Sequence, residues 1–219
     1  ALHDLLRRHQ QKLPDLQWQW QLSKPLPARE YRLQVEESDL DFVRRVLHES
    51  GLFCVVQHAG SPVGSHTLVF CDDSFQLAAL PERSLRYHRA ASSEDGDTLT
   101  HWEGTRQLHP GQVGHRRYDE HPAGSEDHVV NTRLDHGPAG SPLAAALTWH
   151  SARPHRDGED NAHFGQQAER ELQAHESAAR TFATQGNVRA LQAGGWFELG
   201  GHPQHDAEPA DARQFLALS

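Results

Sequence analysis

The chain has 219 residues, a length that suits one large or two small domains. Its 21 Lys and Arg against 30 Asp and Glu give a formal net charge of −9 with neutral His, which argues against a general nucleic-acid or anionic-membrane surface. No apolar run approaches the roughly 20 residues of a membrane-spanning helix, and no basic and then apolar segment opens the chain as a signal peptide would.

The apolar content is low for a compact domain, at 36% of residues. The chain also contains no Met and begins with Ala1, whereas a natural reading frame normally begins with Met. We therefore expect a fragment of a longer protein, whose core is completed by missing segments or by partner subunits.

In chain order, residues 1–28 are predicted to form a helix, a strand and a connector. Leucines recur at helical spacing across residues 2–13, and Pro14 ends the run. Trp and Gln alternate across residues 15–22, which is typical of a strand with one aromatic face. Two prolines make residues 23–28 a connector.

Residues 29–80 are predicted to form a β-α-β-β unit. Tyr31, Leu33 and Val35 alternate with polar residues, which is the period of a half-buried strand. Ser38 can cap a following helix, and Gly51 suits the left-handed position that ends it. The helix carries an apolar stripe that should face a core, made of Leu40, Phe42, Val43, Val46 and Leu47.

The unit continues with two strands. Residues 52–56 form a continuous apolar run that predicts a buried strand, and residues 66–70 return beside it as a hairpin. The only cysteines, Cys54 and Cys71, lie nearly opposite one another if the hairpin turns near Ser61. A disulfide fits this spacing, but two reduced thiols in a protein made in the cytosol are the favoured interpretation.

Residues 81–219 are predicted to form a β-rich domain with one further helix. Residues 161–180 have one apolar and one charged face, which indicates an amphipathic helix capped by Asp160 or Asn161. Residues 122–127 and 151–160 are predicted to be polar loops, and four Gly and Pro residues interrupt residues 136–142. Short strand patterns recur between turn residues, at 85–88, 99–108, 111–118, 129–134, 181–186, 196–199 and 215–218.

Histidine is abundant, with 18 residues, so clusters with the spacing of metal ligands arise by chance. None of them has the His-Glu-x-x-His spacing that places two ligands and a base on one helical face. We interpret them as loop histidines. The three clusters are His202, His205 and Asp206; His121 and His128 with Glu126 and Asp127; and His150, His155 and His163 with Asp157, Glu159 and Asp160.

The sequence also lacks the motifs of other kinds of catalytic site. The acid pairs, Glu36 with Glu37 and Asp72 with Asp73, stand at a helix N-terminus and a strand end, where acids occur for electrostatic reasons. No Gly-x-Ser-x-Gly elbow and no Gly-Lys-Ser/Thr phosphate loop occurs. We therefore predict that the chain is not an enzyme, and we assign no catalytic, cofactor-binding or metal-ligating residue and no cofactor.

Two distant blocks of sequence resemble a known family. The first runs from Ser-Asp-Leu-Asp-Phe at 38–42 through Gly-Leu-Phe at 51–53 to His-Thr-Leu-Val at 66–69. The second begins with Gly-Asn-Val-Arg at 186–189 and ends with His-Pro at 202–203. In this order the blocks resemble the VgrG (valine-glycine repeat) spike proteins of type VI secretion systems, and they are similar to the baseplate hub proteins of contractile phage tails.

The resemblance implies an α+β, β-rich fold, with the β-α-β-β unit, a β-barrel-like baseplate-hub domain and two main helices. Residues 1–28 would be a helix and connector that trail an absent first barrel. Residues 29–80 would be the β-α-β-β unit. Residues 81–219 would be the β-rich hub domain, with a helix at about 161–180 and a truncated C-terminus.

The resemblance also implies a structural role, as the hub-like head that adapts a tail tube to the spike of a contractile injection machine and helps to deliver effectors. The implied assembly is a homotrimer in contact with an Hcp-like tail-tube ring, a baseplate and effector or adaptor proteins. It would assemble in the bacterial cytoplasm and then be secreted or injected by the machine. Two alternatives stay open, a phage tail baseplate hub and, from another class, a His-rich metal-dependent hydrolase.

Overall fold

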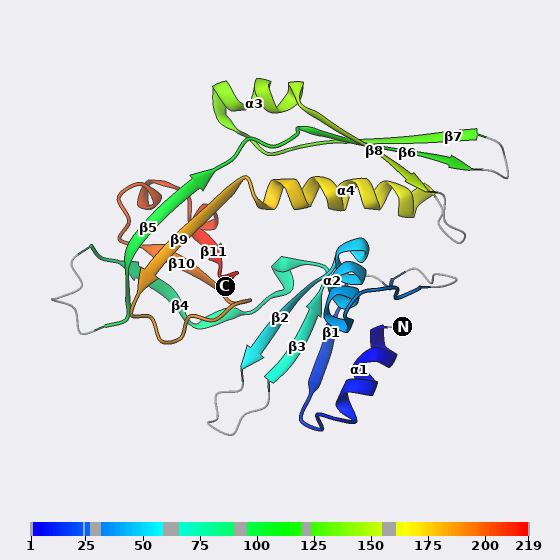
Figure 1. Ribbon diagram of the computed structural model, residues 1–219. Helices are drawn as coiled ribbons and strands as arrows, with labels where there is room; N and C mark the ends of the chain where they lie inside the picture. Colours follow the sequence, from blue (N-terminus) through cyan, green and yellow to red (C-terminus); the bar gives the residue numbers. More distant parts are fainter. Residues whose placement is uncertain are drawn as a thin grey trace. The chain divides into compact units, whose positions relative to one another are not determined.

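A computed structural model describes residues 2–23, 25–26, 32–58, 66–89, 96–119, 124–154 and 161–218 (Figure 1). The described residues form an α+β, strand-rich fold, as predicted. The chain divides into two compact units: unit 1 comprises residues 1–25, 34–103 and 183–219, and unit 2 comprises residues 26–33 and 104–182. The division expected at residues 28 and 80 stays a prediction, and the two units instead gather stretches that lie far apart in the sequence.

Unit 1 contains a β-α-β-β unit, but its first strand lies earlier in the sequence than expected. In chain order the unit consists of β1 (Gln17–Gln21), α2 (Asp39–Ser50), β2 (Phe53–His58) and β3 (His66–Cys71). β3 is the central strand, parallel to β1 and antiparallel to β2.

The strand predicted around Leu33 and Val35 is therefore wrong for the described residues. Tyr31 lies outside them, residues 32–35 form no strand, and the side chains of Leu33 and Val35 are exposed. Residues 31–35 and residues 17–21 both show the period-two alternation of a strand, so the sequence pattern could not show which segment pairs with β3. Trp20 of β1 stacks on Phe70 of β3 with 4.6 Å between ring centroids, which favours β1 as the partner.

The predicted ends of α2 are confirmed. The backbone N–H of Asp41 donates to the Ser38 hydroxyl at 3.1 Å, which satisfies one of the free donors of the first turn. Gly51 follows the helix with φ of 64°, and the N–H of Leu52 donates to the carbonyl of Leu47 at 2.8 Å. Because this conformation strains any residue with a Cβ, Gly51 is the natural stop.

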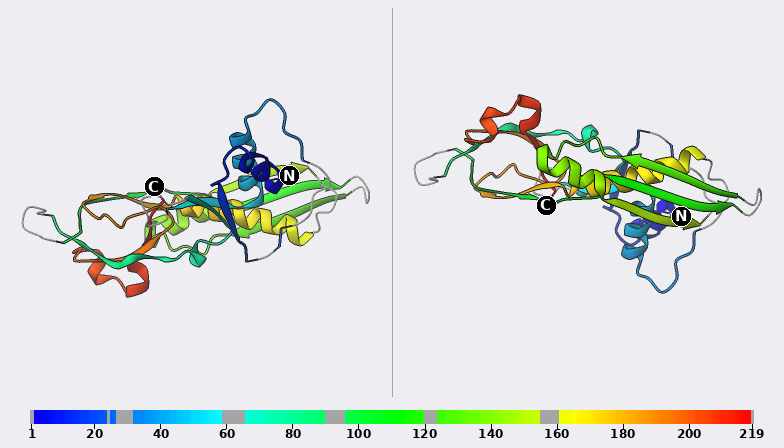
Figure 2. Two further views of the ribbon diagram at one scale, coloured as in Figure 1. Left: turned by 90° about the horizontal axis from the view of Figure 1, so that it is seen from below. Right: turned by 90° about the horizontal axis from the view of Figure 1, so that it is seen from above.

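The stripe on α2 packs mainly as predicted. Phe42 and Val46 are buried against Leu5 of α1 (Leu2–Gln10), and the two helices lie side by side in all three views (Figure 1, Figure 2). Leu47 is also buried, but Leu40, two turns earlier on the same face, is 56% exposed. The prediction was wrong for Leu40, which lies in the first turn of the helix, before the buried residues Phe42, Val46 and Leu47.

β2 is a strand as predicted, but only one of its faces is buried. Val55 packs beside Val69 and Leu77, whereas Cys54 is exposed. Cys54 pairs with Phe70, so the two cysteines are one position out of register and project from opposite faces of the sheet. Both are free thiols, which agrees with the favoured interpretation.

A five-stranded sheet completes unit 1. Its core is formed by Leu80, Leu85, Leu99, Phe197 and Leu199, with Trp102 and Phe215 packed against it. β9 lies at one edge, as the sequence pattern at 181–186 predicted. In spatial order the strands are β11 (Gln214–Leu216), β10 (Trp196–Gly200), β4 (Ala79–Tyr87), β5 (Thr98–Arg106) and β9 (Arg180–Gly186). Short 3₁₀ turns also occur among the described residues of this unit: η1 (Ser74–Gln76), η3 (His205–Ala207) and η4 (Ala210–Arg213).

Unit 2 is a three-stranded sheet with a long helix along one face. β6 (Gln112–Asp119) is central, antiparallel to β7 (Gly124–Asn131) and parallel to β8 (Thr148–Pro154). α4 (Asn161–Ser177) is the helix predicted at 161–180, and it runs along this sheet (Figure 1, Figure 2). Its Ala168 and Leu172 pack on Val113 of β6.

Two loops predicted in unit 2 are wrong in part. β7 begins at Gly124, within the expected loop at 122–127, and β8 ends at Pro154, within the expected loop at 151–160. A helix that the sequence did not predict, α3 (Gly137–Ala146), precedes β8. A proline stands in its first turn, where a backbone N–H has no helical partner, and Pro142 lies inside the helix.

The β-barrel-like arrangement is also not formed. Each of the three sheets in the described residues is open, with different strands at its two edges. α2 and α4 are the longest of the described helices, in agreement with the two main helices expected. None of the helices in the described part of the chain has both the length and the apolar content that crossing a membrane requires.

Leu47→Ala should lower the free energy of unfolding by about 3 kcal/mol, because it leaves a cavity under α2. Leu40→Ala, the same change at the exposed position of the same face, should alter it by less than about 0.5 kcal/mol. Urea unfolding followed by circular dichroism measures both values. Equal costs for the two variants would contradict the packing of α2.

Candidate functional site

Polar side chains connect α4 to the sheet of unit 2. His115 of β6 has a fully buried side chain, and its Nε2 lies 2.5 Å from a carboxylate oxygen of Glu171 on α4. The indole N–H of Trp149, on β8, donates to the other oxygen of Glu171 at 2.8 Å. One carboxylate therefore connects the helix to two strands.

A second buried charge lies on the same face of β6. Arg117 is 3% exposed, and its Nε donates to Glu126 of β7 at 2.6 Å. The guanidinium also lies over the ring of Phe164 on α4, 4.5 Å from the ring centroid. Because a charge in an apolar interior needs partners, the carboxylate and the aromatic ring together make this position tolerable.

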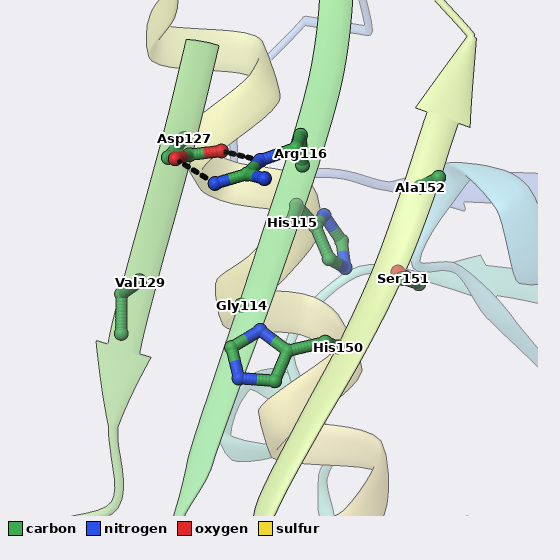
Figure 3. A pocket seen from close by; sticks show the side chains of 8 residues that line it. All are labelled: Gly114, His115, Arg116, Asp127, Val129, His150, Ser151 and Ala152. Carbon is green, nitrogen blue, oxygen red and sulfur yellow. Dashed lines mark hydrogen bonds and ion pairs between the residues drawn. The ribbon is translucent and has the colours of Figure 1, made fainter. Parts of the chain in front are cut away.

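The opposite face of the sheet is open and carries a hollow of about 450 Å³. Figure 3 looks onto this face, with the helix behind the strands. The hollow is lined by Gly114, His115, Arg116, Asp127, Val129, His150, Ser151 and Ala152.

The charged groups of this hollow are already paired with each other. Arg116 donates to both oxygens of Asp127, from Nε at 2.6 Å and from Nη2 at 2.7 Å, and Figure 3 draws both bonds. The hydrogen bond from Arg116 lowers the pKa of Asp127 below its usual range, so this carboxylate stays ionised at neutral pH. It is therefore poorly suited to act as a general acid.

The remaining groups of the hollow do not form a nucleophile with its base. Ser151 and His150 are neighbours in β8, so their side chains leave the strand on opposite faces. The ring of His150 lies against Gly114 of β6, where a Cβ would stand 2.5 Å from Nδ1 of the ring. Gly114 thus makes room for an imidazole on the open face, which is a packing role.

In the cluster of His202, His205 and Asp206, considered in the sequence as a metal site, the two histidines are buried in unit 1 and Asp206 is exposed. The indole N–H of Trp102 donates to Nε2 of His205 at 3.1 Å, so the ring proton lies on Nδ1, which is 2.9 Å from Glu208. Both ring nitrogens of His205 are occupied, and Asp206 pairs with Arg213 at 3.8 Å. This arrangement leaves His205 no lone pair for a metal ion.

The other two histidine clusters lie partly outside the described residues. Glu126 and Asp127 are bound to the arginines of β6, and His121 lies outside the described residues. His155 and the acids at 157, 159 and 160 also lie outside them. Across the described ranges, no group of three or more His, Cys, Asp and Glu could hold a metal ion.

Three acids of the two pairs noted in the sequence, Asp72, Asp73 and Glu37, have structural partners. Asp72 accepts the backbone N–H and the hydroxyl of Ser23, at 2.9 and 2.6 Å. Asp73 caps η1 through the N–H of Phe75 at 2.9 Å. Glu37 forms an ion pair with Arg45, which lowers the pKa of its carboxyl.

The Gly-Asn-Val-Arg motif at 186–189 holds the start of β5. Asn187 accepts the backbone N–H of Thr98 through its side-chain oxygen at 2.6 Å. Arg189 donates to Asp97 from its backbone N–H at 2.9 Å and from its guanidinium at 3.1 Å. A Cβ at Gly186 would stand 2.3 Å from the carbonyl oxygen of Thr98, so only glycine allows this approach. The motif is therefore a clamp between two strands.

Reasoning from sequence missed the contacts of His115 and Arg117 altogether. The only available signal was their spacing of two from Val113 in a predicted strand, which places all three on one face. Their partners Glu171 and Phe164 lie about fifty residues away, and no local sequence pattern predicts these contacts.

Comparison with known proteins gives a consistent result. The family model of the phage tail baseplate hub (GPD) matches residues 2–218. The type VI secretion system spike protein VgrG1a of Pseudomonas aeruginosa is 24% identical over 204 residues, which are 90% of this chain and 29% of that protein. The chain thus spans less than a third of the length of this relative.

Among solved structures, the prophage tail protein gp18 of Listeria monocytogenes EGD-e matches with a TM-score of 0.46 and 10% identity. The match covers 85% of this chain and 51% of that one. At this level of similarity we base no conclusion on it.

Arg117→Ala should lower the free energy of unfolding by about 3 kcal/mol, because it leaves Glu126 without its partner beside a buried surface. Arg116→Ala, on the next residue, should leave stability nearly unchanged, since that ion pair faces solvent. Thermal and urea unfolding of both variants would measure the difference. A larger cost for Arg116→Ala would contradict the assigned faces of β6.

His202 should titrate below the usual range for histidine, as followed by NMR of its ring protons. Burial lowers its pKa first and the nearby charge of His205 adds to this, while Asp206 and Glu208 oppose it. Since the folded-state pKa is lowered, this residue contributes stability that is present above pH of about 6.5 and is lost as pH falls through the folded pKa. His202→Gln should weaken that loss. A His202 pKa above the usual range would contradict the burial argument.

Proposed function

The chain belongs to the phage tail baseplate hub family, and from this premise we propose that it is the part of a hub-like head that adapts a tail tube to a central spike. A structural role in a tail spike or hub, rather than an enzymatic one, is what the family indicates. The match over residues 2–218 is the observation that carries the proposal, because it covers both units rather than one isolated motif.

The interior contacts are in keeping with a load-carrying part. The helix of unit 2 is bound to two strands through Glu171, and in unit 1 the clamp at 186–189 ties the end of β9 to the start of β5. Directional bonds of this kind resist sliding between elements. The rival class, a metal-dependent hydrolase, receives no support from the described histidine clusters, whose nitrogens and acids have other partners.

The finer features of the role are proposals. We propose a homotrimer in the complete protein, with an Hcp-like tube ring on one side and effector or adaptor proteins among its partners. We further propose assembly in the bacterial cytoplasm followed by release through the machine. A phage tail baseplate hub remains the closest alternative, and neighbouring genes for a capsid rather than for a secretion ATPase would favour it.

Deletion of residues 30–219 from the complete protein should prevent tail assembly, because the spike would lose its connection to the tube. Fluorescently labelled sheath, observed in cells, reports assembly and contraction directly. The complete protein carrying Arg116→Ala serves as the control, since this exposed side chain supports no interior contact. Normal sheath assembly with the deleted protein would overturn the proposal.

Solution mass provides a second, independent test. The complete protein should have the mass of three chains in size-exclusion chromatography with light scattering, and it should retain an Hcp-like ring on an affinity resin. A complete protein that stays monomeric and retains no ring at micromolar concentration would contradict the trimeric hub.

A further inference from the structure

Two histidines face each other across the hairpin of unit 1, at the ends of β2 and β3. His58 and His66 are directly opposite in the antiparallel register, and both are exposed to solvent. Their Nδ1 atoms are 2.9 Å apart, and their ring planes are nearly perpendicular, at 81°. Neither residue belongs to the three clusters considered in the sequence.

We propose that His58 and His66 form a two-nitrogen chelate for a divalent transition-metal ion of the copper or nickel class. Imidazole is a preferred ligand of these ions, and a pair of imidazoles held on one surface is a bidentate site. Water would occupy the remaining coordination positions, because within the described residues no third His, Cys, Asp or Glu joins them.

The distance between the two Nδ1 atoms indicates which metal ion fits the site. Two nitrogens about 2.05 Å from a metal ion and at right angles, as in square-planar copper or nickel, are about 2.9 Å apart. A tetrahedral zinc ion requires about 3.3 Å for the same bond length. The distance in this hairpin, 2.9 Å, matches the first geometry without movement of the strands.

Proton positions allow the change from hydrogen bond to chelate. Without metal, one Nδ1 donates its proton to the other, which has a lone pair. On binding, that proton moves through solvent to Nε2 of the same ring, so both Nδ1 lone pairs point to the ion and the net charge of the rings is unchanged. Both side chains are exposed, so water can carry the proton and the ion can enter.

The backbone beneath the pair is held in place, which lowers the entropic cost of binding. β2 and β3 pair over six positions, and β3 is the central strand of its sheet. Val69, three residues from His66, is completely buried. A metal ion between the two side chains would therefore close a hairpin whose strands are already in register.

Titration of the chain with Cu(II), followed by electron paramagnetic resonance, tests the proposal. The protein should carry a His-free N-terminal extension, so that the amino group and His3 do not create a separate copper site. We expect the first equivalent of copper to show two nitrogen ligands. His58→Ala and His66→Ala should each lose this signal, whereas His48→Ala, at an exposed position of α2, should retain it.

The same variants give a second readout that does not depend on spectroscopy. Copper should raise the unfolding temperature of the parent and of His48→Ala more than that of the double variant His58→Ala, His66→Ala, with nickel acting more weakly than copper. Circular dichroism checks that the variants are folded. If the parent and the double variant bind copper equally, the pair is only a hydrogen bond and the proposal is wrong. Sheath assembly in cells should be unaffected by the double variant, which separates this site from the hub role.

Discussion

Unit 2 depends on a small number of polar contacts between its helix and its sheet, which accompany the apolar cluster of Val113, Ala168 and Leu172. Glu171 meets the buried His115 and the more exposed Trp149 on two strands, and the buried Arg117 lies between Glu126 and Phe164. A hydrogen bond needs a matched donor and acceptor at a set distance, whereas apolar side chains tolerate sliding. The polar contacts therefore set the rotation and the position of α4 on the strands.

The residues that mark the family act through structure rather than chemistry. Gly186, Asn187 and Arg189 clamp the start of β5, and the His-Pro pair at 202–203 places His202 in an aromatic cluster. These motifs thus serve strand pairing and packing, in agreement with the structural role of baseplate hub proteins.

Local signals predicted local structure well. Ser38 and Gly51 bound α2 correctly because each acts through hydrogen bonds to residues at most five positions away. The helix of residues 161–180 followed from its own amphipathic period. The strand at 31–35 was wrong because period-two alternation also occurs around Trp20, whose contact with Phe70 spans fifty residues. Helix α3 was missed because its Gly and Pro residues are also the residues that mark loops, so the sequence pattern did not separate the two.

By itself, the sequence determined the α+β class, the two main helices and the family. These depend on helix caps, hydrophobic periodicity and motifs, all of which are formed by residues close together in the sequence. The tertiary structure decided which strand joins β3, that the sheets stay open, and where the ring proton of His205 lies. The hydrogen bond that orients His205 comes from Trp102, 103 positions away. Such a contact forms only when two distant segments meet in the folded chain, so no local sequence pattern can predict it.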